Sequence, residues 1–201
     1  MEKKLQAMVA EGLLPDVLTF AGNGEPTAHP QFADIIDDTI RLRDQYCPEA
    51  KVSVLSNATQ LHRRDVFEAL LRVDNNIQKL DTVDADFIRT VDRPVSPNYD
   101  VRNVVEQLKA FQGHVIIQTI FFNVEEREKK SSKLLPPSSN IGAAFVEPWL
   151  KIVADIRPQS VMIYTIDRET PIKGLEKASP DELNRIRDLV IAEGIPCTAS
   201  Y

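Results

Sequence analysis

The sequence has little cysteine: Cys47 and Cys197 are the only two in 201 residues, and they lie far apart. A disulfide framework needs more cysteines than this, and so does an iron–sulfur or zinc site whose ligands are thiolates. The composition therefore argues against any metal or iron–sulfur centre built from this chain's thiols alone.

The sequence also lacks a long apolar run and an excess of positive charge. No segment approaches the roughly 18 to 20 apolar residues that a membrane helix needs. The opening MEKKLQAMVAEGLL is charged and unlike a secretory signal, so we expect a cytoplasmic chain with no membrane partner. With 30 acidic residues against 24 basic ones, the net charge of -6 disfavours broad nucleic-acid binding, although a local basic groove stays open.

Short β-branched runs alternate with helical patterns along the whole chain. Strands are predicted to begin at Val17, Val52, Ile77, Val115 and Val161. These runs are apolar almost throughout and stand one βα unit apart, as expected for parallel strands covered by helices. The sequence predicts an α/β fold in one domain, 1–201.

Helical periodicity fills most of the intervals. Apolar residues recur at helical spacing over 32–40, 101–108 and 183–190, and Ser179, Pro180 and Glu182 form a capping-box pattern before the last of these. Further helices are predicted at the start, ending near Gly12, and after Asp65. Residues 123–144 are charged and then rich in serine and proline, so we expect a mobile loop there, either a lid or a plain solvated insertion.

The segment after the first predicted strand carries Gly22, Gly24, Glu25 and Pro26. Glycines permit unusual backbone torsions and let a ligand approach the main chain, and a carboxylate stiffened by proline can accept hydrogen bonds from an ammonium group. The same residues also suit an ordinary tight turn with a solvated acid. No Lys-Ser or Lys-Thr pair follows, so this is not a phosphate-binding P-loop.

Polar residues also follow or interrupt the later strands. In βα folds, ligands bind at the carboxyl ends of the strands, which makes these residues candidates for a site, although turns and salt bridges would explain them as well. They are Ser56, Asn57, Lys79, Asp81, Gln118, Thr119, Tyr164, Asp167 and Arg168.

Five blocks in order resemble the radical S-adenosylmethionine superfamily, and the resemblance covers nearly the whole chain. VLTFAGNGEPTAHPQF resembles the glycine-rich loop after the second barrel strand, in the form found in a branch of small iron–sulfur oxidoreductases. VSVLSNAT, IQKLDTVDADFIRTVDRP, VIIQTIFF and VMIYTIDRETP look like the later blocks. The resemblance implies a (β/α)6 barrel of parallel strands that binds S-adenosylmethionine.

The resemblance also implies roles for individual residues. Glu25, with Gly22, Gly24 and Pro26, would hold the methionine ammonium group, and Ser56 and Asn57 would approach its carboxylate or the ribose. The residues of the later strands would line the barrel interior or its mouth, near cofactor or substrate. These are Gln118 and Tyr164 for the cofactor, and Lys79, Asp81, Thr119, Asp167 and Arg168 for the substrate.

One departure from the family is severe. The family's first strand is followed by a CxxxCxxC loop that holds a [4Fe–4S] cluster, and no such loop occurs here. We interpret the chain as a partial barrel that lacks its first strand and cluster loop, by truncation or, alternatively, as a degenerate relative. The exposed edge of the strand at Val17 should then make the isolated chain poorly soluble or dimeric.

The resemblance implies a reaction for the complete protein. A reductant would supply an electron to the cluster, S-adenosylmethionine would be cleaved to a 5′-deoxyadenosyl radical, and this would abstract hydrogen from an unidentified substrate. We expect the isolated chain to be inactive. Two alternatives are a non-catalytic S-adenosylmethionine-binding module and an unrelated βα-barrel enzyme that uses Glu25 and Asp81 as acid–base groups.

Overall fold

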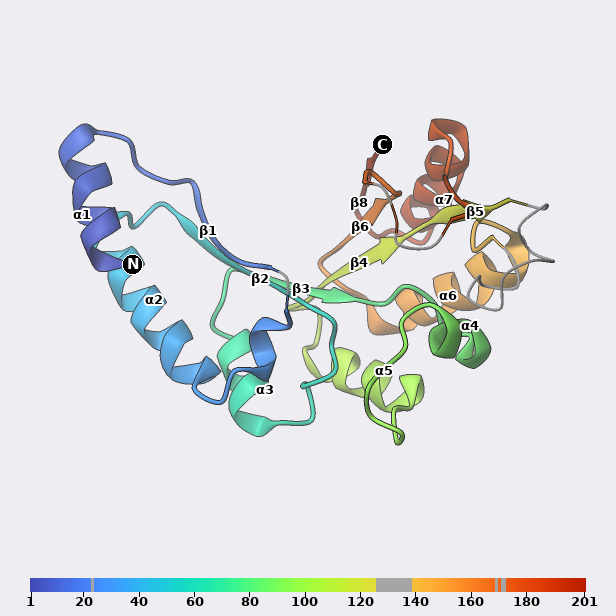
Figure 1. Cartoon of the computed structure of the whole chain (residues 1–201), viewed down its shortest axis with the longest axis horizontal. Coiled ribbons are helices and arrows are strands. Elements are labelled where there is room, and N and C mark those ends of the chain that lie inside the picture. The colour runs from blue at the N-terminus through green and yellow to red at the C-terminus, as the bar shows by residue number, and fades with distance from the viewer. Residues whose placement is uncertain (23, 126–138, 169, 171–172) are drawn as a thin grey trace. The chain divides into compact units, whose positions relative to one another are not determined.

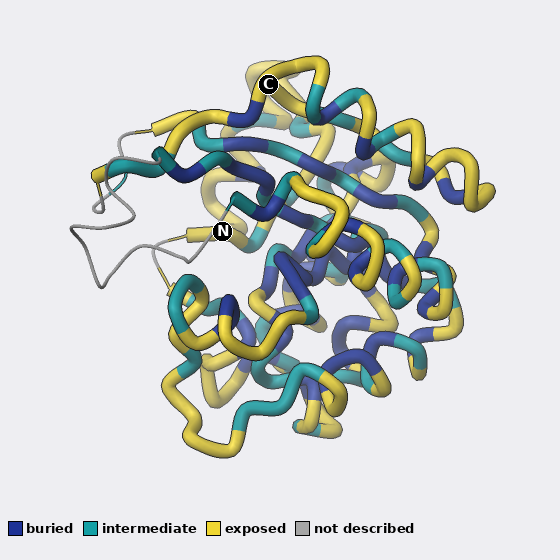
Figure 2. The backbone as a smooth tube through the Cα atoms, turned by 90° about the vertical axis from the view of Figure 1, so that its right-hand side faces the viewer, coloured by how far each residue is buried: buried dark blue, intermediate teal, exposed yellow. Residues whose placement is uncertain are grey.

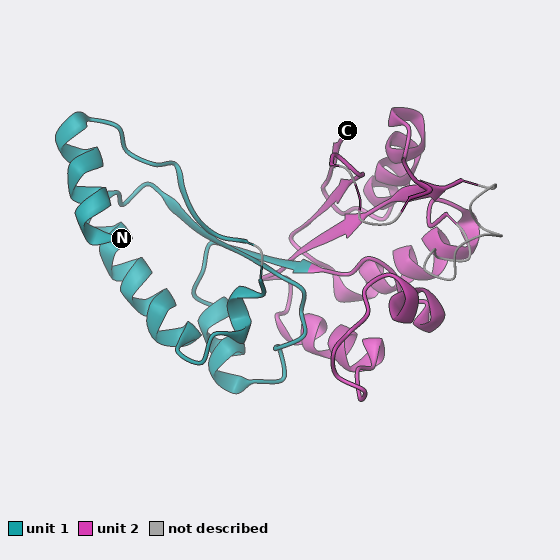
Figure 3. Cartoon of the chain, in the orientation of Figure 1, with its two compact units in different colours: residues 1–78 teal, residues 79–201 magenta. Residues whose placement is uncertain are grey.

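The computed structural model describes residues 1–22, 24–125, 139–168, 170 and 173–201. The chain divides into two compact units, Met1–Gln78 and Lys79–Tyr201 (Figure 3). Strands and helices alternate along both units (Figure 1), which confirms the predicted α/β class. Within the described ranges, every helix is too short or too polar to cross a bilayer.

The first unit contains three strands in the order β1-β2-β3, and both of its ladders are parallel. All three strands lie where the sequence predicts them. Its helices also match: the opening helix ends at Gly12, whose φ of 70° places it in the left-handed conformation that glycine accommodates. The elements are α1 (Glu2–Glu11), β1 (Val17–Phe20), the 3₁₀ helix η1 (Pro26–Ala28), α2 (Phe32–Tyr46), β2 (Lys51–Ser56), α3 (Arg64–Leu70) and β3 (Asn75–Lys79).

One face of this sheet packs against helices. Leu18 of β1 contacts a buried cluster of Leu5, Leu42, Cys47 and Ala50, in which Cys47 packs as a small hydrophobic side chain. Because side chains alternate along a strand, Val17 and Thr19 occupy the opposite face, and both are exposed. Buried and exposed residues likewise alternate at helical spacing along the helices (Figure 2).

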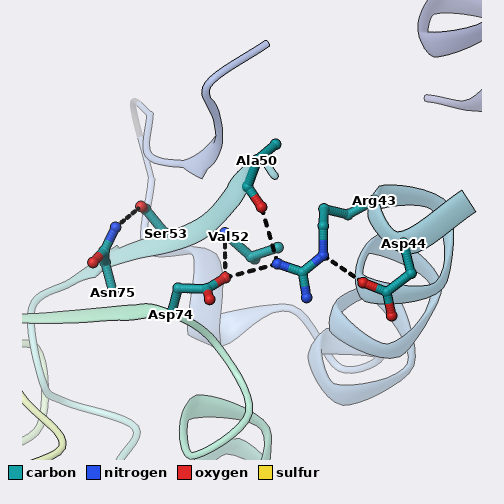
Figure 4. A network of polar contacts seen from close by, with 7 residues as sticks. All are labelled: Arg43, Asp44, Ala50, Val52, Ser53, Asp74 and Asn75. Carbon is teal, nitrogen blue, oxygen red and sulfur yellow. Dashed lines mark hydrogen bonds and ion pairs between the residues drawn. The ribbon is translucent and has the colours of Figure 1, made fainter. Parts of the chain in front are cut away.

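A polar network braces the amino ends of the strands in this unit (Figure 4). Arg43 of α2 donates through Nη1 to the carbonyl oxygen of Ala50 (3.0 Å) and to Oδ2 of Asp74 (2.9 Å). The same Asp74 oxygen accepts a hydrogen bond from the backbone N–H of Val52 at 2.7 Å. The network joins α2 to the starts of β2 and β3, at the end of the sheet away from the polar strand ends described below.

The second unit contains the parallel strands β4, β6 and β8 and the antiparallel pair β5 and β7. The helix after Ser179 begins with the predicted capping box, in which the Ser179 and Glu182 side chains each accept from the other's backbone N–H. The elements are α4 (Ala85–Thr90), α5 (Val101–Ala110), β4 (Ile116–Ile120), β5 (Phe122–Val124), α6 (Ala143–Ile156), β6 (Ser160–Tyr164), β7 (Leu175–Lys177), α7 (Pro180–Ala192) and β8 (Cys197–Ser200).

The run VIIQTIFF, predicted as one strand, is divided at Phe121 into β4 and β5. Asn140, which is 1% exposed, accepts at Oδ1 from the backbone N–H of Phe122 and donates through Nδ2 to the carbonyl oxygen of Ile120. Its side chain therefore satisfies the backbone on both sides of the break.

The predicted loop over 123–144 is shorter at both ends than expected. Asn123 and Val124 belong to β5, and Ala143 begins α6. Of the remaining segment, residues 126–138 lie outside the described part of the chain, so the prediction of a lid stays a prediction.

Candidate functional site

Glu25 joins the loop after β1 to the end of β2. Its Oε1 accepts hydrogen bonds from the backbone N–H (3.0 Å) and the hydroxyl of Thr27, which makes it the N-cap of η1. Its Oε2 accepts from the backbone N–H of Asn57 at 2.7 Å. Pro26 occupies the first turn of η1, where a missing N–H costs nothing. The carboxylate is therefore held in one place by two separate segments.

Gly22 and Gly24 do not have the torsions that the sequence suggested. Neither has a positive φ, and a Cβ atom added at either position would meet nothing within 4 Å. The expectation that they supply unusual torsions is therefore wrong. Both are exposed and Glu25 is half-buried, so the backbone of this loop and the carboxylate stay accessible to a ligand.

Arg63 braces the same loop, a role that the sequence did not reveal. Its Nη1 donates to the carbonyl oxygen of Thr27 at 3.2 Å and its Nη2 to that of Pro30 at 3.5 Å. Nη2 also pairs with Asp65 at 2.6 Å, and the guanidinium holds the pKa of that carboxyl below its usual range. The two carbonyl partners of Arg63 lie 36 and 33 positions away in the sequence, so no local pattern predicts these contacts.

Ser56 and Asn57 lie at the carboxyl end of β2, and their oxygens serve the turn. Ser56, 3% exposed, accepts at Oγ from the N–H of Ala58. Asn57 is exposed, and its Oδ1 accepts from the N–H (3.0 Å) and hydroxyl (2.6 Å) of Thr59. The side-chain oxygens of Ser56 and Asn57 thus stabilise the turn, which is the alternative that the sequence left open. The contact between Asn57 and Glu25 is made by the backbone N–H of Asn57.

In the second unit, the carbonyl oxygen of Leu80 fixes the chain just after β3. It accepts from Thr119 Oγ1 at 2.9 Å and from Trp149 Nε1 at 3.0 Å, while the Leu80 N–H donates to the carbonyl oxygen of Gln118. Thr119 and Trp149 are both fully buried. Side chains alternate in direction along an extended segment. Lys79 and Asp81, the residues on either side of Leu80, therefore point to the face opposite that of the Leu80 side chain.

Lys79 and Asp81 form an ion pair there, with Nζ and Oδ2 3.0 Å apart. The other oxygen of Asp81 accepts from the backbone N–H of Ile120 at 3.0 Å, and Asp81 is only 8% exposed. Burial opposes the charged form of Lys79, but the negative charge of Asp81 outweighs it and raises the pKa of the lysine. The lysine therefore stays protonated and is held by an anchored carboxylate.

Three further groups interact electrostatically with this pair. Tyr164 lies at the end of β6. Burial raises the pKa of its phenol, and the nearby Lys79 ammonium opposes this shift without cancelling it. Burial and the charge of Asp92 raise the pKa of Tyr99 to about 12. Burial and the charge of Asp81 raise the pKa of Asp92 to about 7. We call Lys79, Asp81, Asp92, Tyr99 and Tyr164 the second-unit polar cluster.

The sequence suggested that Gln118 and Thr119 line the same surface. In the structure they do not. Successive side chains point to opposite faces of a strand, and Thr119 is buried against Leu80. Gln118 shares its face with Met162 and, two residues on, with Tyr164. Thr119 therefore has a structural role in holding Leu80, and its assignment to the substrate pocket stays a prediction.

Asp167 and Arg168 follow β6 and are both exposed. The partner of Asp167 is Lys177 of β7, at 3.9 Å, rather than the neighbouring arginine. The predicted grouping of all these residues around one cofactor involves both units and stays a prediction. What the structure brings together is Glu25 with Asn57 in the first unit, and Lys79, Asp81 and Tyr164 in the second.

The chain's own residues do not fit an iron–sulfur cluster. Burial raises the pKa of the Cys197 thiol to about 11 and raises that of Cys47, whereas cluster ligands are thiolates. Over the part of the chain that the structure describes, no three His, Cys, Asp or Glu side chains are grouped so that they could hold a metal ion.

Glu25 does fit an ammonium group, because it is anchored, accessible and carries acceptor capacity beyond the bonds it makes.

No family model matches the sequence. Among curated proteins, a UPF0026 protein of Helicobacter pylori is 28% identical over 172 residues, which cover 84% of this chain and 49% of that protein. The chain thus spans about half the length of this relative.

Solved structures give a clearer match in fold. A domain of pyruvate-formate lyase-activating enzyme from Bacteroides vulgatus has a TM-score of 0.64 at 14% identity, covering 92% of this chain and 98% of that one. A radical SAM methyltransferase from Sphaerobacter thermophilus also gives 0.64 at 14% identity, over 99% and 55%. SuiB of Streptococcus suis, solved with S-adenosylmethionine bound, gives 0.64 at 13%, over 100% and 42%. The chain therefore has the α/β fold of radical SAM enzymes.

Proposed function

We propose that this chain is the S-adenosylmethionine-binding part of a radical enzyme whose [4Fe–4S] cluster is held by residues outside it. In the complete protein the cofactor supplies a 5′-deoxyadenosyl radical that takes hydrogen from substrate. The isolated chain, having no residues suited to the cluster, is proposed to bind S-adenosylmethionine weakly and to be catalytically inactive.

The observation that carries this proposal is the anchoring of Glu25. A free carboxylate on a loop would lose conformational entropy each time it bound a ligand, whereas Glu25 is already fixed by Thr27 and Asn57. Its surroundings leave the backbone at Gly22 and Gly24 open. The cofactor's ammonium would donate to this carboxylate, while the neighbouring backbone and Asn57 would contact its carboxylate or ribose.

The residues of the second unit are proposed to contact the substrate and the part of the cofactor that faces it. Gln118 and Tyr164 share one face of the sheet, and Lys79 and Asp81 lie beside Tyr164. We assign Gln118 and Tyr164 to the cofactor side and the Lys79–Asp81 pair to the substrate. Asp167 and Arg168 are kept as candidates because they follow the same strand.

Calorimetry of the chain with S-adenosylmethionine tests the proposal. Glu25→Ala and Glu25→Gln should both weaken binding by about tenfold or more, because either change removes the charge that the ammonium needs. Glu49→Ala, at an exposed acid of the same unit, is the matched control and should bind as the unchanged chain does. Saturable binding that survives both Glu25 changes would contradict the proposal, and so would no binding at millimolar cofactor.

A further inference from the structure

The loops that follow β1 and β2 are attached to each other at two separate points. At the first, the backbone N–H of Asn57 donates to Oε2 of Glu25 at 2.7 Å. At the second, Arg63 donates through Nη1 to the carbonyl oxygen of Thr27 (3.2 Å) and through Nη2 to that of Pro30 (3.5 Å). The carboxylate of Glu25 and the guanidinium of Arg63 therefore belong to one arrangement of two loops.

Thr27 connects the two attachment points. Its backbone N–H (3.0 Å) and its hydroxyl donate to Oε1 of Glu25, while its carbonyl oxygen accepts from Arg63. Thr27 is fully buried in η1. Because the same residue bonds to both side chains, any displacement of its backbone would also move the donors that hold the Glu25 carboxylate. Arg63 thus acts on Glu25 through Thr27.

The Arg63 guanidinium is itself oriented by Asp65. Its Nε donates to Oδ1 of Asp65 at 3.2 Å and its Nη2 to Oδ2 at 2.6 Å. This is the fork that a planar guanidinium forms with a carboxylate, and it leaves Nη1 directed at Thr27. The adjacent Arg64 is placed differently, since its side chain is 89% exposed and pairs with Glu68 of its own helix.

We propose that Arg63 is a positioning residue for S-adenosylmethionine binding. Oriented by Asp65, it fixes η1 through Thr27 and so keeps the Glu25 carboxylate in the arrangement that receives the ammonium group of the cofactor. A loop that is already fixed loses less conformational entropy when its ligand arrives, and this favours binding. The proposal rests on the proposed function, because it takes Glu25 as the group that binds the cofactor.

The first test needs no cofactor. Amide hydrogen exchange, followed by NMR in the whole chain, reports how often the N–H groups of Thr27 and Asn57 leave their acceptor. Arg63→Ala should speed the exchange of both by about tenfold. The N–H of Val52, bonded at the other end of β2, is the reference and should exchange as before. Unchanged rates at Thr27 and Asn57, or an equal increase at Val52, would overturn the proposal.

Two further variants make the exchange measurement specific. Arg63→Lys keeps the charge and can donate to one of the two carbonyl oxygens, but it lacks the planar fork, so it should restore part of the protection. Arg64→Ala removes the neighbouring arginine and should leave both amides as they are in the unchanged chain. An effect of Arg64→Ala as large as that of Arg63→Ala would contradict the role assigned to Arg63.

The second test is calorimetry with S-adenosylmethionine. Arg63→Ala should weaken binding about fivefold, with partial recovery in Arg63→Lys. Asp74→Ala controls for general loss of stability, because it breaks a network at the opposite end of the strands, and it should bind as the unchanged chain does. Binding that Arg63→Ala leaves unchanged, or weakens no more than Asp74→Ala does, would overturn the proposal.

The two tests separate this inference from the proposed function. Cofactor binding that is lost in Glu25→Ala but unaffected by Arg63→Ala would contradict the present inference alone. A chain that never binds the cofactor, yet whose Thr27 and Asn57 amides depend on Arg63, would contradict the proposed function and leave Arg63 as the residue that positions Glu25.

Discussion

The backbone N–H of Asn57 donates a 2.7 Å hydrogen bond to Oε2 of Glu25, so an acid in the loop after β1 is tied to the residue that follows β2. The two residues are 32 positions apart. The tie places the carboxylate at the carboxyl ends of parallel strands, where βα folds bind their ligands. It also gives Glu25 a structural role that is independent of any ligand.

Glu25→Ala should therefore lower the free energy of unfolding of the chain by about 1 kcal/mol, since the N–H groups of Thr27 and Asn57 lose their acceptor but gain water. Glu25→Gln should cost less, because its amide oxygen can still accept one of these bonds. Chemical denaturation measures both. A chain whose stability is unchanged by Glu25→Ala would show that the tie contributes nothing to folding.

Removing Asp74 should weaken the network at the amino ends of the strands. We expect Asp74→Ala to cost about 1–2 kcal/mol, because the Val52 N–H and the largely buried Arg43 guanidinium both lose a partner. S-adenosylmethionine binding should be unaffected in folded protein, since the network lies at the other end of the strands. Asp38→Ala, an exposed acid paired with Arg41, serves as the control and should have little effect.

The same network should respond to acid. Burial raises the pKa of Asp74, but the Val52 N–H and Arg43 outweigh it and hold the pKa below its ordinary value. The stability that this carboxylate contributes is therefore complete above its unfolded-state pKa and is lost as pH falls through the lower folded-state value. Unfolding measured below about pH 4 should show this loss in the unchanged chain and not in Asp74→Ala. If the stability of the two proteins fell identically with pH, Asp74 would not be the source of this loss.

The contribution of Asp92 to stability should depend on pH in the opposite direction. Its pKa in the folded chain is raised to about 7, so the folded state binds more protons than the unfolded state between the two pKa values, and stability falls as pH rises through this window. Burial and the charge of Asp81 raise this pKa, and the charge of Lys79 opposes them.

Because the side chain of Asp92 is exposed, solvent screens much of this effect, and Asp92→Asn should gain about 1 kcal/mol at alkaline pH. The gain should vanish near pH 4. A gain that does not depend on pH would show that Asp92 does not titrate in this range.

The two side chains that donate to the Leu80 carbonyl oxygen should be coupled. Thr119→Val and Trp149→Phe each remove one donor, and the carbonyl keeps the other. We expect the double variant to lose about 1 kcal/mol more than the sum of the single variants, because only then is the buried oxygen left without a side-chain donor. Strict additivity in a double-mutant cycle would count against this shared role.

Local signals predicted much of the fold. The capping box at Ser179 and Glu182 and the left-handed Gly12 are determined by a few neighbouring residues, so the ends of α7 and α1 could be predicted. The helix α6 was missed, and it contains Pro148, which ordinarily argues against a helix interior. The break between β4 and β5 depends on Asn140, 18 residues beyond Phe122, and no local pattern shows such a contact.

The residues of the candidate site could likewise be predicted only where a local sequence signal marks them. Glu25 could be found because a short motif marks it, and its half-buried, anchored carboxylate agrees with that signal. Thr119 was assigned to the substrate pocket together with its neighbours, but the alternation of side chains along a strand separates it from Gln118 and leaves it buried against Leu80. Asp92 and Tyr99 were missed because they follow a helix rather than a strand, and only the fold brings them near Lys79 and Asp81.

The most direct measurement is an NMR titration of the chain with S-adenosylmethionine, in which each backbone amide is followed separately. We predict that the resonances of Gly22, Gly24, Thr27 and Asn57 move together and reach saturation. Glu25→Gln should remove these shifts while the rest of the spectrum keeps its folded dispersion. Shifts confined to other parts of the chain, or none at saturating cofactor, would contradict the assignment of this loop as the cofactor site.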